Sequence, residues 1–179
     1  MTEETLHIPV SAEQTVTAIR TLPESAAAGW LFVYAPGAGS NVHDPFGAYA
    51  CRTLADQGYV AARFQFPYAE SRRRRPDRPA VLEATWRQVV SNLREDGLKL
   101  VVGGRSMGGR IASQVVAAGT QADALVLFAY PLHPPGDPSK LRDRHLPAIE
   151  VPTLFCSGTR DNFATADELA SAASLVSRS

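Results

Sequence analysis

The chain has 179 residues, 45% of them hydrophobic, so it is long enough to bury a core of its own. Its 18 lysine and arginine residues balance its 18 aspartate and glutamate residues, which argues against a general attraction to nucleic acid or to membrane surfaces. The N-terminus lacks a basic segment followed by an apolar one, and no apolar run approaches the length of a membrane span. We therefore expect a cytoplasmic protein that forms a single domain over residues 1–179.

The two cysteines indicate neither a disulfide framework nor a metal site. Cys51 falls in a predicted helix and Cys156 in a predicted strand, and their spacing matches no common ligand pattern. We expect no metal ion and no organic cofactor.

Strand-like and helix-like segments alternate along the chain after an opening hairpin. In order, we predict two antiparallel strands (5–10 and 15–20), a strand (30–35), a helix (45–57), a strand (59–66), a proline- and arginine-rich loop (67–79), a helix (81–94), a strand (100–102), a helix from 109, a strand (124–130), a loop (131–150), a strand (151–157) and a helix (164–176). This pattern predicts an α/β fold, a doubly wound and mostly parallel sheet with helices on both faces. Functional residues in such sheets gather at the carboxyl ends of the strands.

A short motif lies between the apolar run at 100–102 and the helix that Gly109 opens. Gly104-Arg105-Ser106-Met107-Gly108 matches GxSxG. A strand, a tight turn and a helix are the context of a nucleophile elbow, in which the glycines let strand and helix approach closely. Ser106 is therefore the candidate nucleophile. A glycine-rich turn at a helix N-terminus also suits a phosphate, and the motif alone leaves that alternative open.

Ester hydrolysis by Ser106 needs N–H donors for the oxyanion and a carboxylate that supports the base. The backbone N–H of Met107 is the first expected donor. The loop from Pro36 to Gly39 follows the strand at 30–35, and we expect Ala38 to supply the second donor, although a plain glycine turn is the alternative. Asp161 follows the strand at 151–157 and is the candidate acid, and a helix cap is the alternative there.

Five stretches, spread from about residue 30 to 163, carry a resemblance to a known family. They are YAPGAGS from Tyr34, FQFPYAESRRRRPDRP from Phe64, GGRSMGGR from Gly103, YPLHPPGDPSKLRDRHLP from Tyr130 and PTLFCSGTRDNF from Pro152. The chain resembles the α/β-hydrolase superfamily, and within it the small dienelactone-hydrolase-like family, whose eukaryotic relatives include a subunit of the non-specific-lethal acetyltransferase complex. The resemblance implies a serine hydrolase of small-molecule carboxylic esters, with Ser106 as nucleophile and Asp161 as triad acid.

The catalytic histidine of this family has no counterpart here. The chain order Ser, Asp, His requires a histidine after Asp161, and no histidine follows it. The final strand, the histidine loop and the C-terminal helix are also absent, so we expect a C-terminally incomplete domain with weak activity. The base of a triad is defined by geometry rather than by chain order, so the other histidines are also candidates, although poorer ones. They are His7, His43, His133 and His145. A non-catalytic scaffold or interaction domain is the alternative function.

Without a last strand, the strand at residues 153–156 becomes an apolar sheet edge. Such an edge invites pairing, which predicts a homodimer or a C-terminal segment exchanged with a partner.

Five arginines occupy seven positions in the loop after the strand at 59–66, namely Arg72 to Arg75 and Arg78. The simplest interpretation is a loop whose arginines are hydrated by solvent. The second interpretation is that they bind a phosphate or a substrate carboxylate. Nucleic acid is disfavoured, because no aromatic residues are interleaved and the chain has no net positive charge. We expect Arg72, Arg105 and His133 to contact the substrate.

Overall fold

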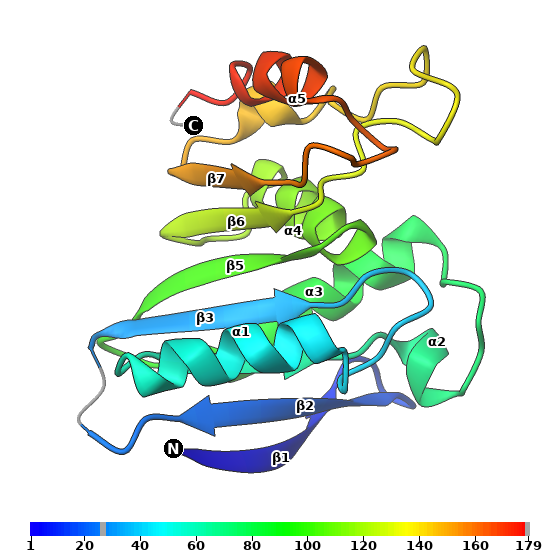
Figure 1. Cartoon of the computed structure of the whole chain (residues 1–179). Coiled ribbons are helices and arrows are strands. Elements are labelled where there is room, and N and C mark those ends of the chain that lie inside the picture. The colour runs from blue at the N-terminus through cyan, green and yellow to red at the C-terminus, as the bar shows by residue number, and fades with distance from the viewer. Residues whose placement is uncertain (26–27, 178–179) are drawn as a thin grey trace.

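A twisted, mixed β-sheet forms the centre of the computed structural model, which describes residues 1–25 and 28–177 (Figure 1). Within those residues the sheet has seven strands in the order β1-β2-β4-β3-β5-β6-β7. The strands are β1 (Thr2–Pro9), β2 (Thr15–Leu22), β3 (Trp30–Ala35), β4 (Val60–Phe64), β5 (Lys99–Arg105), β6 (Ala124–Phe128) and β7 (Thr153–Cys156). β2 pairs antiparallel with β1 and β4, and every later pairing is parallel. The predicted hairpin and mostly parallel sheet are confirmed.

The helices follow the predicted order, with a short helix and a 3-10 turn added inside the two predicted loops at 67–79 and 131–150. They are α1 (Pro45–Asp56), α2 (Pro67–Glu70), α3 (Pro79–Leu93), α4 (Met107–Ala117), the 3-10 turn η1 (Leu146–Ala148) and α5 (Ala166–Ala173). The Asp44 carboxylate caps α1 by accepting a hydrogen bond from the Gly47 N–H at 2.9 Å. The prediction of a loop over residues 67–79 is wrong at its start, where α2 begins. Pro67 occupies the first helical position, where its fixed φ angle favours a helical turn.

Alternate side chains of the strands pack into two separate cores, one on each face of the sheet. On β3, Leu31 and Val33 join the larger core, which also holds buried residues of α3 and α4. Phe32 and Tyr34 point the other way and join a smaller core with Cys51 of α1. The predicted helices on both faces are therefore confirmed, and Figure 1 shows α1 in front of the sheet with α3 and α4 behind it.

β7 lies at one edge of the sheet, as the sequence predicts. Within the described residues no strand pairs with its outer side, and Leu154 is 55% exposed. On the α1 side of the sheet, an apolar groove of about 790 Å³ extends from α1 over β3, β5 and β6. In the part of the chain that the structure describes, no helix is both long and apolar enough to cross a membrane.

The buried guanidinium of Arg63 ties β4 to β1 and to the segment before α1. Arg63 is 3% exposed, and its Nε donates to the Val42 carbonyl at 2.9 Å while one NH group donates to Glu3 at 3.0 Å. Hydrogen bonds from Arg52 and Arg63 lower the pKa of Glu3 from 4.5 to about 2. Glu3 is therefore the counter-charge of a buried cation.

We expect the Glu3→Gln variant to lose about 1–3 kcal/mol of unfolding free energy at pH 7, because Arg63 keeps its buried charge without a carboxylate. The pKa of Glu3 is lower in the folded chain. The ionised Glu3 carboxylate therefore contributes its full share of the unfolding free energy above about pH 4.5, and this share decreases as the pH falls toward 2. Urea denaturation at pH 7 and pH 3 measures this loss. Glu13→Gln is the control, because Glu13 is exposed in the turn between β1 and β2 and takes part in no ion pair among the described residues. An equal effect of Glu3→Gln at both pH values would contradict the assignment.

Candidate active site

Ser106 occupies a strained turn between the end of β5 and the start of α4. Its φ is 51° and its ψ is −120°, a conformation that non-glycine residues rarely adopt and that costs on the order of 1–3 kcal/mol. Two backbone hydrogen bonds hold the turn: the Ser106 N–H donates to the Phe128 carbonyl at 2.8 Å, and the Arg110 N–H donates to the Ser106 carbonyl at 3.0 Å. The turn has the backbone geometry that the GxSxG motif predicts.

The glycines around Ser106 allow β3, β5 and α4 to approach to backbone contact. A Cβ atom added to Gly104 or to Gly108 would lie 2.3 Å from the Ala35 carbonyl oxygen. The Trp86 indole of α3 also donates to the Gly108 carbonyl at 3.2 Å. The elbow is therefore held by contacts with residues that are distant in the sequence.

The loop from Pro36 to Gly39 lies beside Ser106. A Cβ atom added to Gly37 would lie 3.5 Å from the Ser106 Cβ, so the loop backbone is in contact range of the serine. The Gly39 N–H donates at 3.2 Å to the hydroxyl of Tyr68, which is 1% exposed, and this bond anchors the loop to α2. Among the described residues, no backbone hydrogen bond uses the N–H of Ala38 or of Met107. Neither residue is among those that line the Ser106 cleft, and their role as oxyanion donors stays a prediction.

Ser106 and Asp161 line one cleft of about 580 Å³ at the carboxyl ends of the parallel strands. Its walls come from the end of β5, the residue after β6 and the loop after β7, and its lining residues are Arg105, Ser106, Ala129, Gly158, Thr159, Arg160, Asp161, Asn162 and Phe163. The Asp161 carboxylate accepts the Ser157 hydroxyl at 2.7 Å and the Phe163 N–H at 2.9 Å, which fixes its orientation. A serine in an elbow and an oriented carboxylate therefore share one cavity.

A family model described as an alpha/beta hydrolase domain matches residues 28–178 of the chain. The chain belongs to this α/β-hydrolase family. The match spans the sheet from β3 onward, together with Ser106 and Asp161. The superfamily expected from the loop motifs is confirmed.

Solved structures with the same fold include several hydrolases. A dienelactone hydrolase from Anabaena variabilis superposes with a TM-score of 0.78 at 20% identity, covering 99% of this chain and 82% of that one. The protein Est1E from Butyrivibrio proteoclasticus gives 0.79 at 12% identity, with 97% and 85% covered. A lidless α/β serine hydrolase from Xanthomonas campestris gives 0.74 at 18% identity, with 98% and 80% covered. At these identities the likeness shows the fold.

The three predicted substrate-contacting residues of this α/β hydrolase lie in different places. Arg105 lines the Ser106 cleft. Arg72 is exposed in the loop after α2, with a φ of 53°, and is not among the residues that line the cleft. His133 is 6% exposed, and its backbone N–H donates to the Phe163 carbonyl at 3.1 Å, so it supports the loop that carries Asp161.

None of the four histidines, all of which lie in the described part of the chain, is among the residues that line the cleft. The His133 ring lies 2.8 Å from the Pro134 carbonyl and 3.3 Å from Glu168, and these contacts raise its pKa. His145 lies 2.7 Å from the Ser113 hydroxyl of α4, and burial lowers its pKa. His7 is on β1, and His43 is exposed before α1.

Sequence reasoning missed Ala129, Arg160 and Phe163 in the cleft wall. Ala129 follows β6 with a φ of 48°, and no pattern in the neighbouring sequence predicts this conformation. Arg160 had a usable signal, because it adjoins the candidate acid in the segment Gly158-Thr159-Arg160-Asp161. Among the described residues, no group of three or more histidine, cysteine, aspartate or glutamate side chains is placed to hold a metal ion.

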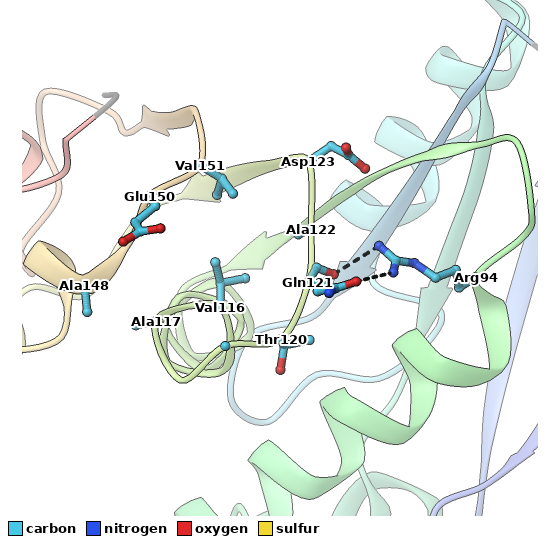
Figure 2. Close-up of a pocket in the computed structure, with 11 residues that line it drawn as sticks. Arg94, Val116, Ala117, Thr120, Gln121, Ala122, Asp123, Ala148, Glu150 and Val151 are labelled. Atoms are coloured by element: carbon cyan, nitrogen blue, oxygen red, sulfur yellow. Dashed lines mark hydrogen bonds between the residues drawn. The ribbon is translucent and has the colours of Figure 1, made fainter.

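A second hollow lies at the opposite end of the sheet. It measures about 540 Å³ and lies between the C-terminal end of α4 and the segments that lead into β6 and β7 (Figure 2). Arg94 crosses one side of it and donates to the side-chain and backbone oxygens of Gln121, at 3.2 and 3.4 Å. Ligands of open α/β sheets bind at the carboxyl ends of the strands, so the Ser106 cleft is the candidate active site.

Proposed function

We propose that this α/β hydrolase cleaves carboxylic esters of small molecules with Ser106 as its nucleophile. The observation that carries the proposal is the strained Ser106 turn in one cleft with the oriented carboxylate of Asp161. The printed names of structural neighbours include a dienelactone hydrolase and a cold-adapted esterase, and they support carboxylic esters as the substrate class.

In the proposed reaction, the Ser106 oxygen attacks the ester carbonyl carbon and the hydroxyl proton passes to solvent water, because no histidine lines the cleft. The N–H groups of Ala38 and Met107 stabilise the oxyanion of the tetrahedral intermediate. Collapse of the intermediate expels the alcohol, which takes up a proton, and leaves an acyl group on Ser106 that water then hydrolyses. We assign Asp161 as the acid of the triad, the residue that in a complete triad orients the base and stabilises its protonated form.

We expect slow turnover, because the histidines of this chain lie outside the cleft. Loss of the base typically costs a factor of about 10⁴–10⁶ in rate, while substrate binding and the oxyanion hole remain. Weak hydrolysis of activated esters is the form of activity that the proposal predicts.

A fluorophosphonate probe tests the proposal, since it reacts with serines that are activated by their surroundings. The folded chain is expected to be labelled in a time-dependent manner, and an excess of 4-nitrophenyl acetate is expected to slow the labelling. Chain denatured in urea before the probe is added is the control. Absence of labelling above that control would contradict the proposal.

A scaffold or interaction domain that does not catalyse hydrolysis is the second candidate. It is favoured by the positions of the histidines, since His133 and His145 are engaged at Pro134 and Ser113. The unpaired edge of β7 suits such a role, and the homodimer or segment exchange through it stays a prediction. The cytoplasmic location also stays a prediction.

A further inference from the structure

The loop beside Ser106 closes as a tight turn from Gly37 to Ser40. The Ser40 N–H donates to the Gly37 carbonyl at 3.2 Å, and Gly39, the third residue of the turn, has a φ of 76°. A positive φ at this position is typical of a type II turn. Type I and type II turns differ by a flip of their central peptide, so the turn holds one of two orientations of the peptide that joins Ala38 to Gly39.

The phenol of Tyr68 holds that peptide in its orientation. The hydroxyl oxygen accepts the Gly39 N–H at 3.2 Å, and Tyr68 is 1% exposed. Burial raises the pKa of the Tyr68 hydroxyl above its ordinary value, so the phenol stays neutral. A flip of the peptide would turn the Gly39 N–H away from the phenol and break this bond. The bond therefore favours the turn that the structure shows.

Tyr68 is itself fixed through its ring and through its backbone. Its ring lies nearly parallel to that of Phe66, at an interplanar angle of 13°. Its backbone N–H donates to the Asp77 carboxylate at 2.8 Å, and its carbonyl accepts the Arg73 N–H at 2.8 Å. The Arg73 guanidinium donates to the same Asp77 carboxylate at 2.6 Å. Three hydrogen bonds thus tie residues 68, 73 and 77 together.

Two members of the arginine-rich segment therefore have a structural role. The Asp77 side chain is 11% exposed and closes the loop after α2 back onto Tyr68. Contacts run from Arg73 and Asp77 through Tyr68 to the turn beside Ser106. At that turn, a Cβ atom added to Gly37 would lie 3.5 Å from the Ser106 Cβ.

We propose that Tyr68 is a positioning residue of this hydrolase, and that Asp77 acts through it. Tyr68 keeps the turn from Gly37 to Ser40 in the shape that the reaction at Ser106 requires. This inference rests on the proposed function and adds two residues to it. Groups that stabilise an oxyanion are effective when they are held in place before the reaction, so a fixed turn lowers the barrier while Tyr68 itself stays out of contact with the substrate.

Tyr68→Phe removes the hydroxyl and keeps the ring. The kcat for 4-nitrophenyl acetate is expected to fall about 5-fold, with KM within about 2-fold of the wild-type value, because the turn acts on the transition state. Tyr130→Phe is the matched control. It removes an equally buried hydroxyl, which donates to the Arg142 carbonyl at 2.6 Å, and Tyr130 is not among the residues that line the cleft. An unchanged kcat in the Tyr68→Phe chain would overturn the inference.

A double-mutant cycle tests the part of Asp77. Asp77→Ala is expected to lower kcat about 3-fold in the wild-type chain and to have no further effect in the Tyr68→Phe chain, because effects that pass through one residue are not additive. Asp77→Asn should keep most of the activity, since its amide oxygen still accepts the Tyr68 N–H. Additive effects of Asp77→Ala and Tyr68→Phe on log kcat would show that Asp77 does not act through Tyr68.

Amide hydrogen exchange separates this inference from the proposed function. In the Ser106→Ala chain, NMR follows exchange of the Gly39 N–H without any reaction at residue 106. About 10-fold faster exchange after addition of Tyr68→Phe, and not of Tyr130→Phe, would support the role of Tyr68 even if no Ser106-dependent hydrolysis were found. Unchanged exchange would overturn that role even if Ser106 proved to be the nucleophile.

Discussion

Hydrolysis of 4-nitrophenyl acetate by the Ser106→Ala chain is expected to be at least about 10-fold slower than hydrolysis by the wild-type chain. The variant keeps the other residues that line the cleft but has no oxygen to attack the ester. The expected loss is smaller than in a complete triad. Because no histidine of this chain lines the cleft, removal of the nucleophile is expected to cost less, since the effects of triad members are strongly non-additive.

Rates are measured as 4-nitrophenolate release, with the rate in buffer subtracted. Ser171→Ala is the matched control, because Ser171 is an exposed serine of α5 outside the cleft. Circular dichroism and thermal melts of both variants should match those of the wild type. If the Ser106→Ala chain hydrolysed the ester as fast as the wild type, its hydroxyl would not be the nucleophile and the scaffold function would be favoured.

The Gly108→Ala variant is expected to lose at least about 3 kcal/mol of unfolding free energy. The added Cβ would lie 2.3 Å from the Ala35 carbonyl oxygen and 2.5 Å from that of Pro36. Both obstacles are backbone atoms of the chain at the end of β3, so relief requires β3 and α4 to separate. The same movement would displace the loop from Pro36 to Gly39 from Ser106.

Urea denaturation of the purified variant measures this loss. Gly158→Ala is the matched control, since its φ is outside the positive region and a Cβ there meets no atom within 4 Å in the described structure. Its stability should stay within about 0.5 kcal/mol of the wild type. A Gly108→Ala chain as stable as the wild type would show that α4 does not pack against β3 as described.

Much of the fold could be predicted from the sequence because its signals are local. Continuous apolar runs mark the buried strands, and Asp44 with Pro45 marks the start of α1. The turn at Ser106 could also be predicted, because its glycines are needed for the backbone contacts that the structure shows. Segments with only one helical turn, such as α2, lack enough periodicity to be predicted.

The cleft depends on contacts that sequence spacing does not encode. Arg160 and Ala129 reach the same cavity from loops after different strands, so their proximity follows from strand order. His133 lies in the stretch from Tyr130 that resembles the family. In the structure, however, its backbone supports the loop that carries Asp161 and its ring contacts Glu168. Only the packed chain distinguishes a residue that lines the cleft from one that supports its wall.

Mapping the fluorophosphonate adduct by peptide mass spectrometry tests the central claim most directly. After labelling of the folded chain and proteolysis, the account predicts a single major adduct on Ser106, reduced to background in the Ser106→Ala chain. An adduct on another nucleophile, such as Ser113 or Cys156, or equal labelling of the variant, would contradict the assignment of Ser106 as the nucleophile of this cleft.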